Sequence, residues 1–429
     1  MLAEYMSSEE KRRLLEKILR ERIDSSPRPA KIVQSLWKMP DDALLLEKQF
    51  RILEQSSGGQ LFFAQSEGLN TNVTRIGNRT YVNYCSYNYL GLSGNEEVSL
   101  AAKEAIDRYG TSVSASRIAS GERPLHQELE TELAVMLGVE ECVTFVGGYG
   151  TNETVIGHLF GPDDLILYDS LSHASIQSGC KLSGAAARPF PHNNWEALNV
   201  LLAEQRERYR YALVVIEGVY SMDGDVPDLP QFIEVKKRHQ AMLMVDEAHS
   251  SGVLGKTGGG IGEHFGVNPH DVDIWMGTLS KSFASCGGYV AGNKELMYYL
   301  RYTVPGFVFS VGMSPPNAAS ALAAIRLMHR EPERVTQLRR NANRFRDMAK
   351  KAGLNTGNSE HSAVIPIILG RSEPCVTLYR KLFENGIYAL PIIYPTVPEN
   401  ASRVRLFLSS LHTDEQLEKT VKLISSAVK

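Results

Sequence analysis

The sequence has few cysteines and no long apolar run. Its five cysteines are an odd number, lie far apart and form no C-x-x-C pair, which favours a reducing compartment over a disulfide framework or a zinc site. No apolar stretch approaches the roughly 18 residues that a membrane helix needs. The charged N-terminus also lacks the apolar core of a secretory signal. These features predict a cytoplasmic protein that binds no membrane and no metal.

A charge excess of one sign is also missing. The 46 basic side chains nearly balance the 49 acidic ones, and the formal net charge is −3, so there is no basic field to attract nucleic acid. The chain has 429 residues, of which 43% are hydrophobic and 22% charged. Such a chain can bury a substantial core, which excludes an intrinsically disordered protein.

The first 58 residues are predicted to form a helical extension. Apolar residues recur at helical spacing over 14–22, and a second helix is expected over 42–53, before the Ser- and Gly-rich boundary at 56–59. A plain role for these helices would be an N-terminal arm that packs on a dimer.

From residue 59 to 304, short apolar runs alternate with helical stretches. This alternation predicts an α/β domain with a mostly parallel central sheet and helices on both faces. The candidate strands are 142–146, 165–168, 212–217, 242–246, 274–277 and 288–291.

Residues 305–429 are predicted to form a smaller α+β domain. It follows a Pro- and Gly-rich break. The expected elements are a long helix over 318–351, strands at 363–368, 390–394 and 403–409, and a helix over 414–428.

Lys281 lies in a turn of small residues just after a predicted strand. The same turn offers Thr278 and Ser280, two hydroxyls that can bind a phosphate. A lysine amine near a phosphate site is what a Schiff base to pyridoxal 5′-phosphate requires. The plain alternative is a surface lysine.

Asp246, His249 and His173 also follow predicted strands. A carboxylate at 246 suits a protonated ring nitrogen, although a helix N-cap or turn residue explains it as well. His249 suits a hydrogen bond to the cofactor's phenolic oxygen. His173 suits stacking on a planar ring and proton donation to a carbonyl. Each histidine taken alone also fits an ordinary packed or loop residue.

Gly148 and Tyr149 lie in a glycine-rich turn between a strand and a helix. Glycines there let the backbone approach a phosphate, but the motif matches neither a G-x-G-x-x-G fingerprint nor a P-loop. Ser221 follows another strand, in a sequence that a plain β-turn also explains. Five polar clusters thus follow five strands, where α/β sheets bind ligands.

Taken together, these motifs resemble the α-oxoamine synthases, a family of fold-type I pyridoxal phosphate enzymes. Its members include 8-amino-7-oxononanoate synthase, 5-aminolevulinate synthase and serine palmitoyltransferase. The resemblance runs from about residue 81 to 423, and is strongest to the oxoamine synthase domains of polyketide-type assembly lines, including the saxitoxin type. The motifs that carry it are Gly148–Tyr149, Asp169–His173, Glu217 with Ser221–Gly224, Asp246–His249 and Gly277–Lys281.

The resemblance implies a role for each candidate residue. The implied catalytic residues are Lys281, His173 and Asp246. The residues implied to bind pyridoxal 5′-phosphate are Gly148, Tyr149, His173, Ser221, Asp246, His249, Thr278, Lys281 and Ser310. Arg405 would grip the substrate carboxylate and Asn88 would line the substrate end of the site. Relatives build each site at a subunit interface, so a homodimer is expected, with Ser310 near the neighbouring subunit's cofactor.

The implied reaction is a decarboxylative condensation of an amino acid with an acyl thioester, giving an α-amino ketone. Glycine, alanine or serine is expected as the amino acid, or arginine as in saxitoxin-type pathways, since Ile393 stands where alanine-using members often have arginine. The expected donor is bound to an acyl-carrier protein. The alternatives are an aminotransferase of the same fold type and a non-catalytic partner subunit.

Overall fold

The computed structural model describes residues 43–44, 46–48, 50–51 and 62–428. The chain divides into two compact units, Met1–Gln55 and Ser56–Lys429. In the first unit the described residues are helical and fall within the helix predicted over 42–53, whereas the helix predicted over 14–22 lies outside the described residues. The helical extension as a domain therefore stays a prediction.

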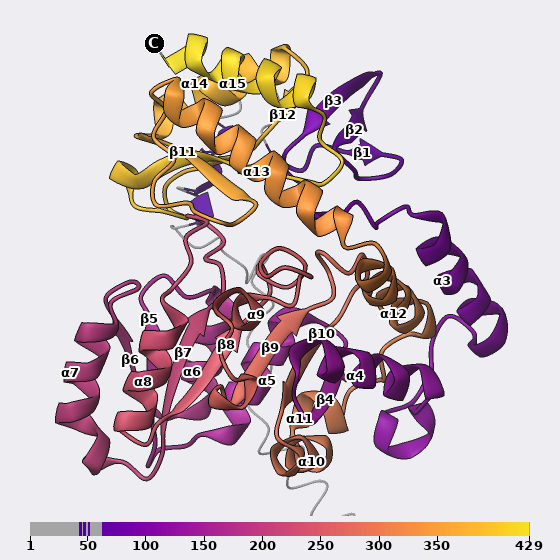
Figure 1. Ribbon diagram of the computed structural model, residues 1–429, viewed down its shortest axis with the longest axis vertical. Coiled ribbons are helices and arrows are strands. Elements are labelled where there is room, and N and C mark those ends of the chain that lie inside the picture. Colours follow the sequence, from indigo (N-terminus) through magenta and orange to yellow (C-terminus); the bar gives the residue numbers. More distant parts are fainter. Residues whose placement is uncertain (1–42, 45, 49, 52–61, 429) are drawn as a thin grey trace, which may run out of the picture. The chain divides into compact units, whose positions relative to one another are not determined.

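A seven-stranded sheet forms the centre of the second unit (Figure 1). Its spatial order is β4-β10-β9-β8-β7-β5-β6. Neighbours from β6 to β9 pair in parallel, and β10 is antiparallel to both β9 and β4. The strands are β4 (Glu141–Phe145), β5 (Leu165–Asp169), β6 (Ala186–Phe190), β7 (Ala212–Glu217), β8 (Met242–Asp246), β9 (Ile274–Thr278) and β10 (Gly288–Gly292). The predicted mostly parallel sheet is confirmed.

Strand β6 is the one strand of this sheet that was not predicted. It lies at the sheet edge, and its sequence, AARPF, leaves only Phe190 buried. Pro189 and the neighbouring Arg188 are tolerated at an edge, where one side of the strand makes no ladder. The apolar run that identified the inner strands is therefore absent from β6.

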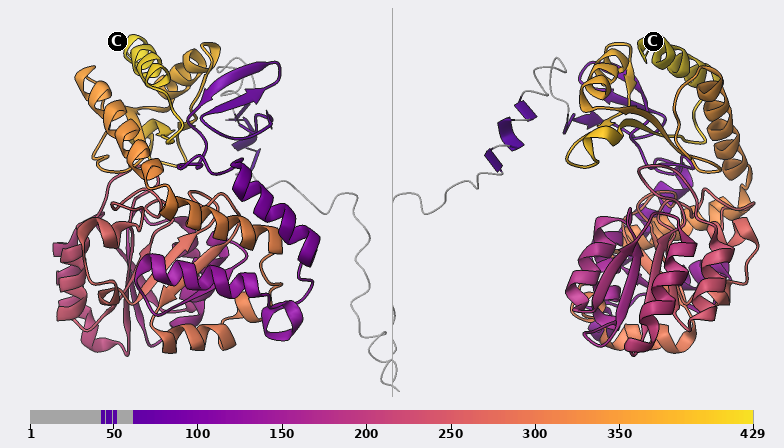
Figure 2. Two further views of the ribbon diagram at one scale, coloured as in Figure 1. Left: turned by 45° about the vertical axis from the view of Figure 1, so that its right-hand side comes forward. Right: turned by 90° about the vertical axis from the view of Figure 1, so that its left-hand side faces the viewer.

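Helices cover both faces of this sheet (Figure 2). On one face, α5, α6, α10 and α11 pack against alternate strand residues in a fully apolar core. Inner strands such as β7 are buried at every position, because both their faces meet helices. The helices joined to this sheet are α4 (Pro124–Leu137), α5 (Gly148–Leu159), α6 (Ala174–Ser183), α7 (Trp195–Gln205), α8 (Leu229–Arg238), α9 (Ile261–Phe265), α10 (Lys294–Thr303) and α11 (Pro305–Val308).

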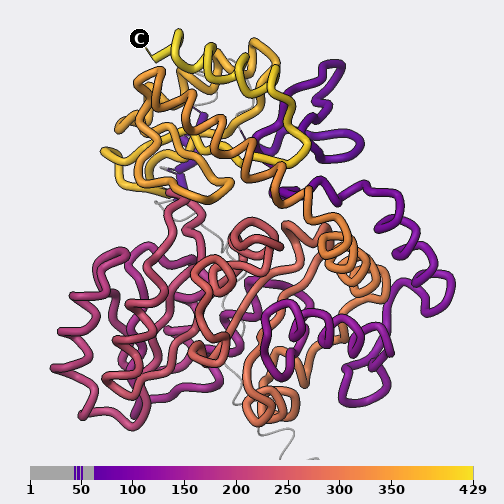
Figure 3. Tube along the Cα trace, viewed as in Figure 1, coloured from indigo at the N-terminus to yellow at the C-terminus, as the bar shows by residue number. Residues whose placement is uncertain are grey.

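Two smaller sheets lie outside the central one. The first has the order β11-β14-β13, and the second β1-β2-β3-β12. Their strands are β1 (Ser66–Glu67), β2 (Val73–Ile76), β3 (Arg79–Asn83), β11 (Val364–Gly370), β12 (Ile387–Tyr388), β13 (Pro391–Ile392) and β14 (Ser402–Phe407). Because β12 pairs in parallel with β3, residues 66–83 lie beside the C-terminal segments (Figure 3). The predicted domain boundaries at residues 58 and 304 stay a prediction. The pairing of β3 with β12 joins a strand of the predicted large domain, 59–304, to a strand of the predicted small domain, 305–429.

The long helix predicted over 318–351 is two helices. They are α12 (Pro315–Arg330) and α13 (Glu333–Lys351). Pro332 lies between them and has no N–H to donate, while its ring clashes with the preceding turn. The prediction of one continuous helix was therefore wrong at this proline. The other helices are α3 (Glu96–Tyr109), α14 (Ser372–Glu384) and α15 (Asp414–Val428), and α15 has the predicted bounds.

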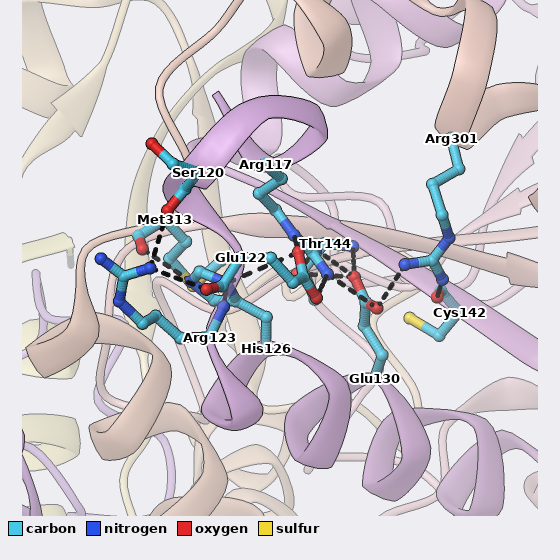
Figure 4. A network of polar contacts seen from close by, with 10 residues as sticks. All are labelled: Arg117, Ser120, Glu122, Arg123, His126, Glu130, Cys142, Thr144, Arg301 and Met313. Carbon is cyan, nitrogen blue, oxygen red and sulfur yellow. Dashed lines mark hydrogen bonds and ion pairs between the residues drawn. The ribbon is translucent and has the colours of Figure 1, made fainter. Parts of the chain in front are cut away.

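A buried ionic network fastens the segment before α4 to the sheet and to α10 (Figure 4). Glu130 on α4 forms ion pairs with Arg117 and, at 3.0 Å, with Arg301. Its carboxylate also accepts hydrogen bonds from the backbone N–H of Thr144 on β4 at 2.8 Å and from the Thr144 hydroxyl at 3.0 Å. Burial alone would raise the pKa of Glu130, but the two arginines hold it below its ordinary value.

In the part of the chain that the structure describes, no helix is long and apolar enough to cross a membrane.

Candidate active site

A cavity of about 330 Å³ opens at the carboxyl ends of the central strands. This is where α/β sheets place their ligand sites. Its lining residues are Tyr87, Gly148, Tyr149, Asn152, His173, Ser175, Glu217, Ser221, Met222, Asp246, Ala248, His249, Met276, Thr278, Ser280, Lys281 and Arg405. The tertiary structure thus brings together ten of the twelve residues singled out in the sequence.

Lys281 lies in the turn that follows β9. Its ammonium nitrogen is 5.6 Å from the centre of the Tyr87 ring. Burial, together with the positive charge of Arg405, lowers the pKa of Lys281 from 10.5 to about 8, although Asp246 and Glu217 oppose the shift. A substantial share of this amine is therefore unprotonated near neutral pH, as a nucleophile or base must be.

Asp246 ends β8 and is buried. Its Oδ2 accepts a hydrogen bond from Asn152 Nδ2 at 2.7 Å, and its Oδ1 accepts one from the Ala248 N–H at 2.9 Å. Glu217 is its register partner on β7. Burial, and then the charge of Asp246, raises the pKa of Glu217 well above its usual range. Glu217 is thus favoured in its neutral form beside Asp246.

His173 is the N-cap of α6, and the structure fixes its tautomer. Its Nδ1 accepts a hydrogen bond from the Ser175 N–H at 3.3 Å and lies 2.7 Å from Ser175 Oγ. Burial and the nearby Lys281 lower the pKa of His173, against the opposing effect of Asp246. A neutral imidazole whose Nδ1 accepts from a backbone N–H carries its proton on Nε2. His173 can therefore donate a hydrogen bond from Nε2.

His249 is held on two sides. Its Nδ1 lies 2.7 Å from Tyr89 Oη, and its ring stacks on Phe407 with centroids 6.0 Å apart. Burial, helped by the positive charges of Lys281 and Arg405, lowers the pKa of His249 well below its usual value. His249 is accordingly a rigid, neutral imidazole.

Gly148, at the start of α5, faces Thr278 at close range. A Cβ on Gly148 would lie 2.7 Å from Thr278 Oγ1, so only glycine leaves room there. Thr278 Oγ1 donates to the carbonyl of Gly287 at 3.0 Å and accepts from the Ser280 N–H at 3.3 Å. Tyr149 contributes a half-exposed ring that meets His173 edge to face. The helix N-terminus and these hydroxyls make a site suited to a phosphate.

Arg405 reaches the cavity from β14. Its Nη1 donates to the carbonyl of Ser221 at 3.0 Å, and its guanidinium lies 4.4 Å from the centre of the Phe407 ring. These contacts fix a guanidinium beside Ser221, in the loop that follows β7. The C-terminal portion of the chain therefore completes the site.

Asn88 and Ser310 lie outside the cavity lining. Asn88 is buried, and its amide is used within its own loop: Nδ2 donates to the carbonyls of Asn70 and Ser93, and Oδ1 accepts from the Ser93 N–H. The adjacent Tyr87 lines the cavity instead. Ser310 follows α11 in an irregular segment.

Four polar lining residues had no site role predicted from the sequence. They are Tyr87, Asn152, Ser175 and Glu217. A signal existed for Asn152, because it lies four residues after Gly148 on one face of a helix that begins at the site. Among the described residues, Asn152 Oδ1 is buried without a hydrogen-bond partner, which is typical of an atom awaiting a ligand.

These residues fit pyridoxal 5′-phosphate. A carboxylate, Asp246, is available for a ring nitrogen, and the amine of Lys281 is available for the aldehyde. The space beside Gly148 and Thr278 is available for the phosphate. The fold and the site together define a fold-type I enzyme dependent on pyridoxal 5′-phosphate.

Comparison with known proteins agrees with this class. A family model described as aminotransferase class I and II matches residues 79–424. The chain is 39% identical to an 8-amino-7-oxononanoate synthase of Fervidobacterium nodosum, over 82% of this chain and 92% of the relative. It is also 39% identical to the same enzyme of Geobacter sulfurreducens, over 86% and 97%. The solved serine palmitoyltransferase of Sphingomonas wittichii superposes with a TM-score of 0.86 at 32% identity, covering 91% of this chain and 98% of that one.

The chain belongs to the aminotransferase class I and II family and, within it, to the α-oxoamine synthases. It is therefore an acyltransferase that depends on pyridoxal 5′-phosphate. The fold and family expected from the motifs are confirmed.

Proposed function

We propose that this enzyme joins an α-amino acid to an acyl thioester and releases carbon dioxide. The amino acid's Cα bonds to the acyl carbonyl carbon, the C–S bond breaks and the thiol departs, and the carboxyl carbon leaves as CO₂. The product is an α-amino ketone. The observation that carries this proposal is one cavity holding Lys281, Asp246, His173 and Arg405, with the pKa of Lys281 lowered to about 8.

When bound, pyridoxal 5′-phosphate supplies an aldehyde for covalent attachment and a ring that withdraws electrons from Cα. Lys281 is proposed as the attachment point and as the base that takes the Cα proton. Asp246, held by Asn152 and by its own loop, keeps a proton on the ring nitrogen. Thr278 and the N-terminus of α5 hold the phosphate.

His173 and Arg405 serve the substrates in this proposal. The Nε2 proton of His173 can be donated to the acyl carbonyl oxygen, where negative charge develops as the C–C bond forms. The planar guanidinium of Arg405 matches a carboxylate in a bidentate manner. His249 and Ser221 are proposed to contact the phenolic oxygen of the cofactor.

Substrate identity and assembly are finer proposals. The amino acid is proposed to be glycine, alanine or serine, or arginine as in saxitoxin-type pathways. Ile393, at the position where alanine-using members often have arginine, is a buried apolar residue. The acyl donor is proposed to be a carrier-protein thioester. A homodimer is proposed, with Ser310 near the neighbouring subunit's cofactor and Asn88 towards the substrate end of the site.

Replacement of the lysine tests the central proposal. Lys281→Ala should abolish ketone formation and leave the circular dichroism spectrum unchanged, since loss of a positioned base alone costs roughly 10²–10⁴-fold. Lys237→Ala is the matched control, because Lys237 pairs with Asp271 away from the cavity. Borohydride reduction of the wild-type holoenzyme should place the cofactor on the peptide that contains Lys281. Ketone formation at a near wild-type rate by Lys281→Ala would exclude this role.

Product analysis separates the alternatives. Release of CO₂ and thiol in equal amounts supports condensation, whereas exchange of amino and keto acids supports an aminotransferase. A non-catalytic subunit would form neither product and take up no label at Lys281. Parallel assays with acyl-carrier-protein and coenzyme A thioesters test the donor, and a strong preference for coenzyme A would reject the carrier-protein proposal.

A further inference from the structure

His192 lies between two buried carboxylates, outside the lining of the active-site cavity. Its Nδ1 is 2.8 Å from Asp169 Oδ1, and its Nε2 is 2.6 Å from Asp225 Oδ2. The three residues follow or end the neighbouring strands β6, β5 and β7 (Figure 1). Asp169 precedes His173 by four residues, and Asp225 follows Ser221 by four. The imidazole thus joins the two loops that carry these site residues.

Asp169 determines the course of the first loop. Its Oδ1 accepts a hydrogen bond from the Leu171 N–H at 2.8 Å, and its carbonyl accepts one from the Ser172 N–H at 2.9 Å. Its Oδ2 accepts from the N–H of Asn193, the neighbour of His192, at 2.8 Å. A displacement of Asp169 would therefore be passed along three consecutive residues to His173.

Asp225 closes the second loop. Its carbonyl accepts a hydrogen bond from the Tyr220 N–H at 3.1 Å, so the turn between them contains Ser221. Asp225 Oδ2 also accepts from Asn193 Nδ2 at 2.6 Å. The His192–Asn193 pair therefore contacts both loops through side chain and backbone.

The geometry places a carboxylate oxygen within hydrogen-bond distance of each ring nitrogen of His192, which suits an imidazole with two N–H donors. Ionised carboxylates only accept hydrogen bonds, and a neutral imidazole has a single N–H. Burial disfavours the charge, but Asp169 and Asp225 raise the pKa of His192 from 6.5 to about 10. The edge-to-face contact with Tyr220 is 4.5 Å between centroids. The other titratable groups that share the adjoining cavity with His192 and Asp225 are Asp228, His264, Glu360 and His361.

We propose that His192, as an imidazolium, is a positioning residue that clamps the His173 loop to the Ser221 loop. The clamp fixes the distance between His173 and Ser221. His173 is the imidazole proposed to stack on the cofactor ring, and Ser221 is proposed to contact the cofactor's phenolic oxygen. This inference rests on the proposed function for its kinetic consequence only. Protonation of His192 and its contacts can be measured without catalysis.

Nuclear magnetic resonance of the full-length protein tests the protonation directly. With ¹⁵N-labelled histidine, both ring nitrogens of His192 should remain protonated at pH 8, and the resonance should titrate near pH 10. The resonance is assigned by its loss in His192→Gln. A neutral single tautomer at pH 8 would overturn the proposal. If His192→Gln does not fold, Asp225→Asn replaces it, and the His192 titration should then move to lower pH.

Kinetics and absorbance of the holoenzyme test the positioning role. A misplacement of about 1 Å costs on the order of 100-fold in rate, so kcat of His192→Gln should fall tenfold or more, with borohydride labelling of Lys281 retained. The pH titration of the bound cofactor's absorbance should also shift. His239→Gln is the matched control, since His239 contacts only the neutral side chain of Asn199 among the described hydrogen-bond partners, and it should alter neither quantity.

A double-mutant cycle separates a clamp from general loss of stability. Asp225→Asn should cost much less in the His192→Gln background than in the wild type, because the charge pair is already gone. Fully additive losses, or an unchanged absorbance titration in His192→Gln, would overturn the proposal. If no ketone forms even in the wild type, the proposed function fails, but the resonance and absorbance results still decide the role of His192.

Discussion

The lowered pKa of Lys281 leads to a quantitative prediction about its reactivity. An amine with a pKa of 10.5 is almost wholly protonated at pH 7, whereas burial and Arg405 bring the pKa of Lys281 to about 8. A shift of this size increases the unprotonated fraction at pH 7 roughly 300-fold, at a factor of ten per unit. The rate of acylation of Lys281 should therefore rise tenfold per pH unit up to about 8 and level off above it.

Competitive labelling of the cofactor-free protein with isotopic acetic anhydride measures this profile peptide by peptide. Lys237 provides an internal control in the same sample, because its hydrogen bond to Asp271 raises its pKa. Its labelling should still be increasing at pH 10. Above about pH 8 the labelling rate of Lys281 should therefore be constant, while the labelling rate of Lys237 still increases.

Two variants test the physical causes of the shift. Asp246→Asn removes a charge that raises the pKa of Lys281, so the break in the profile should move to lower pH. Arg405→Leu removes a charge that lowers this pKa, so the break should move to higher pH. A Lys281 profile that keeps rising to pH 10 in the wild type would refute the reasoning, as would shifts of the opposite sign in the variants.

Three further substitutions have expected outcomes. Gly148→Ala introduces a Cβ 2.7 Å from Thr278 Oγ1, and overpacking of about 1–3 kcal/mol should weaken cofactor binding about fivefold or more by absorbance titration. Gly150→Ala, which meets nothing within 4 Å, should not. Glu130→Leu leaves the buried Arg117 and the partly buried Arg301 without their shared carboxylate, so chemical denaturation should show a loss of about 3–5 kcal/mol. A loss below about 1 kcal/mol would mean that the network adds little. Arg405→Lys replaces the planar guanidinium, which can donate two hydrogen bonds to one carboxylate, by an ammonium group. A charged hydrogen bond contributes about 1.5–3 kcal/mol, so KM for the amino acid should rise tenfold or more. KM for the thioester should not change.

The inner strands could be predicted because burial on both faces leaves a continuous apolar run, as in β7 and β8. Edge strand β6 could not be predicted, since only one of its five residues is buried and its sequence contains Arg188 and Pro189. The break between α12 and α13 was visible at Pro332 and was missed because apolar periodicity continues on both sides. Pairing of β3 with β12 joins residues over 300 apart in sequence, and local patterns hold no information about such a contact.

The residues alone were enough to predict the chemistry of the site. A lysine, a carboxylate and two histidines at the ends of three strands, with a glycine at a helix start, predict a phosphate-bearing aldehyde cofactor, because parallel strands bring their carboxyl ends to one edge. Which side chains enter the cavity was decided by tertiary packing. Tyr87 lines the cavity, whereas the amide of the neighbouring Asn88 bonds to the backbone of Asn70 and Ser93. The protonation of Lys281 and His192 was also decided there, since burial and neighbouring charges act only once the chain has folded.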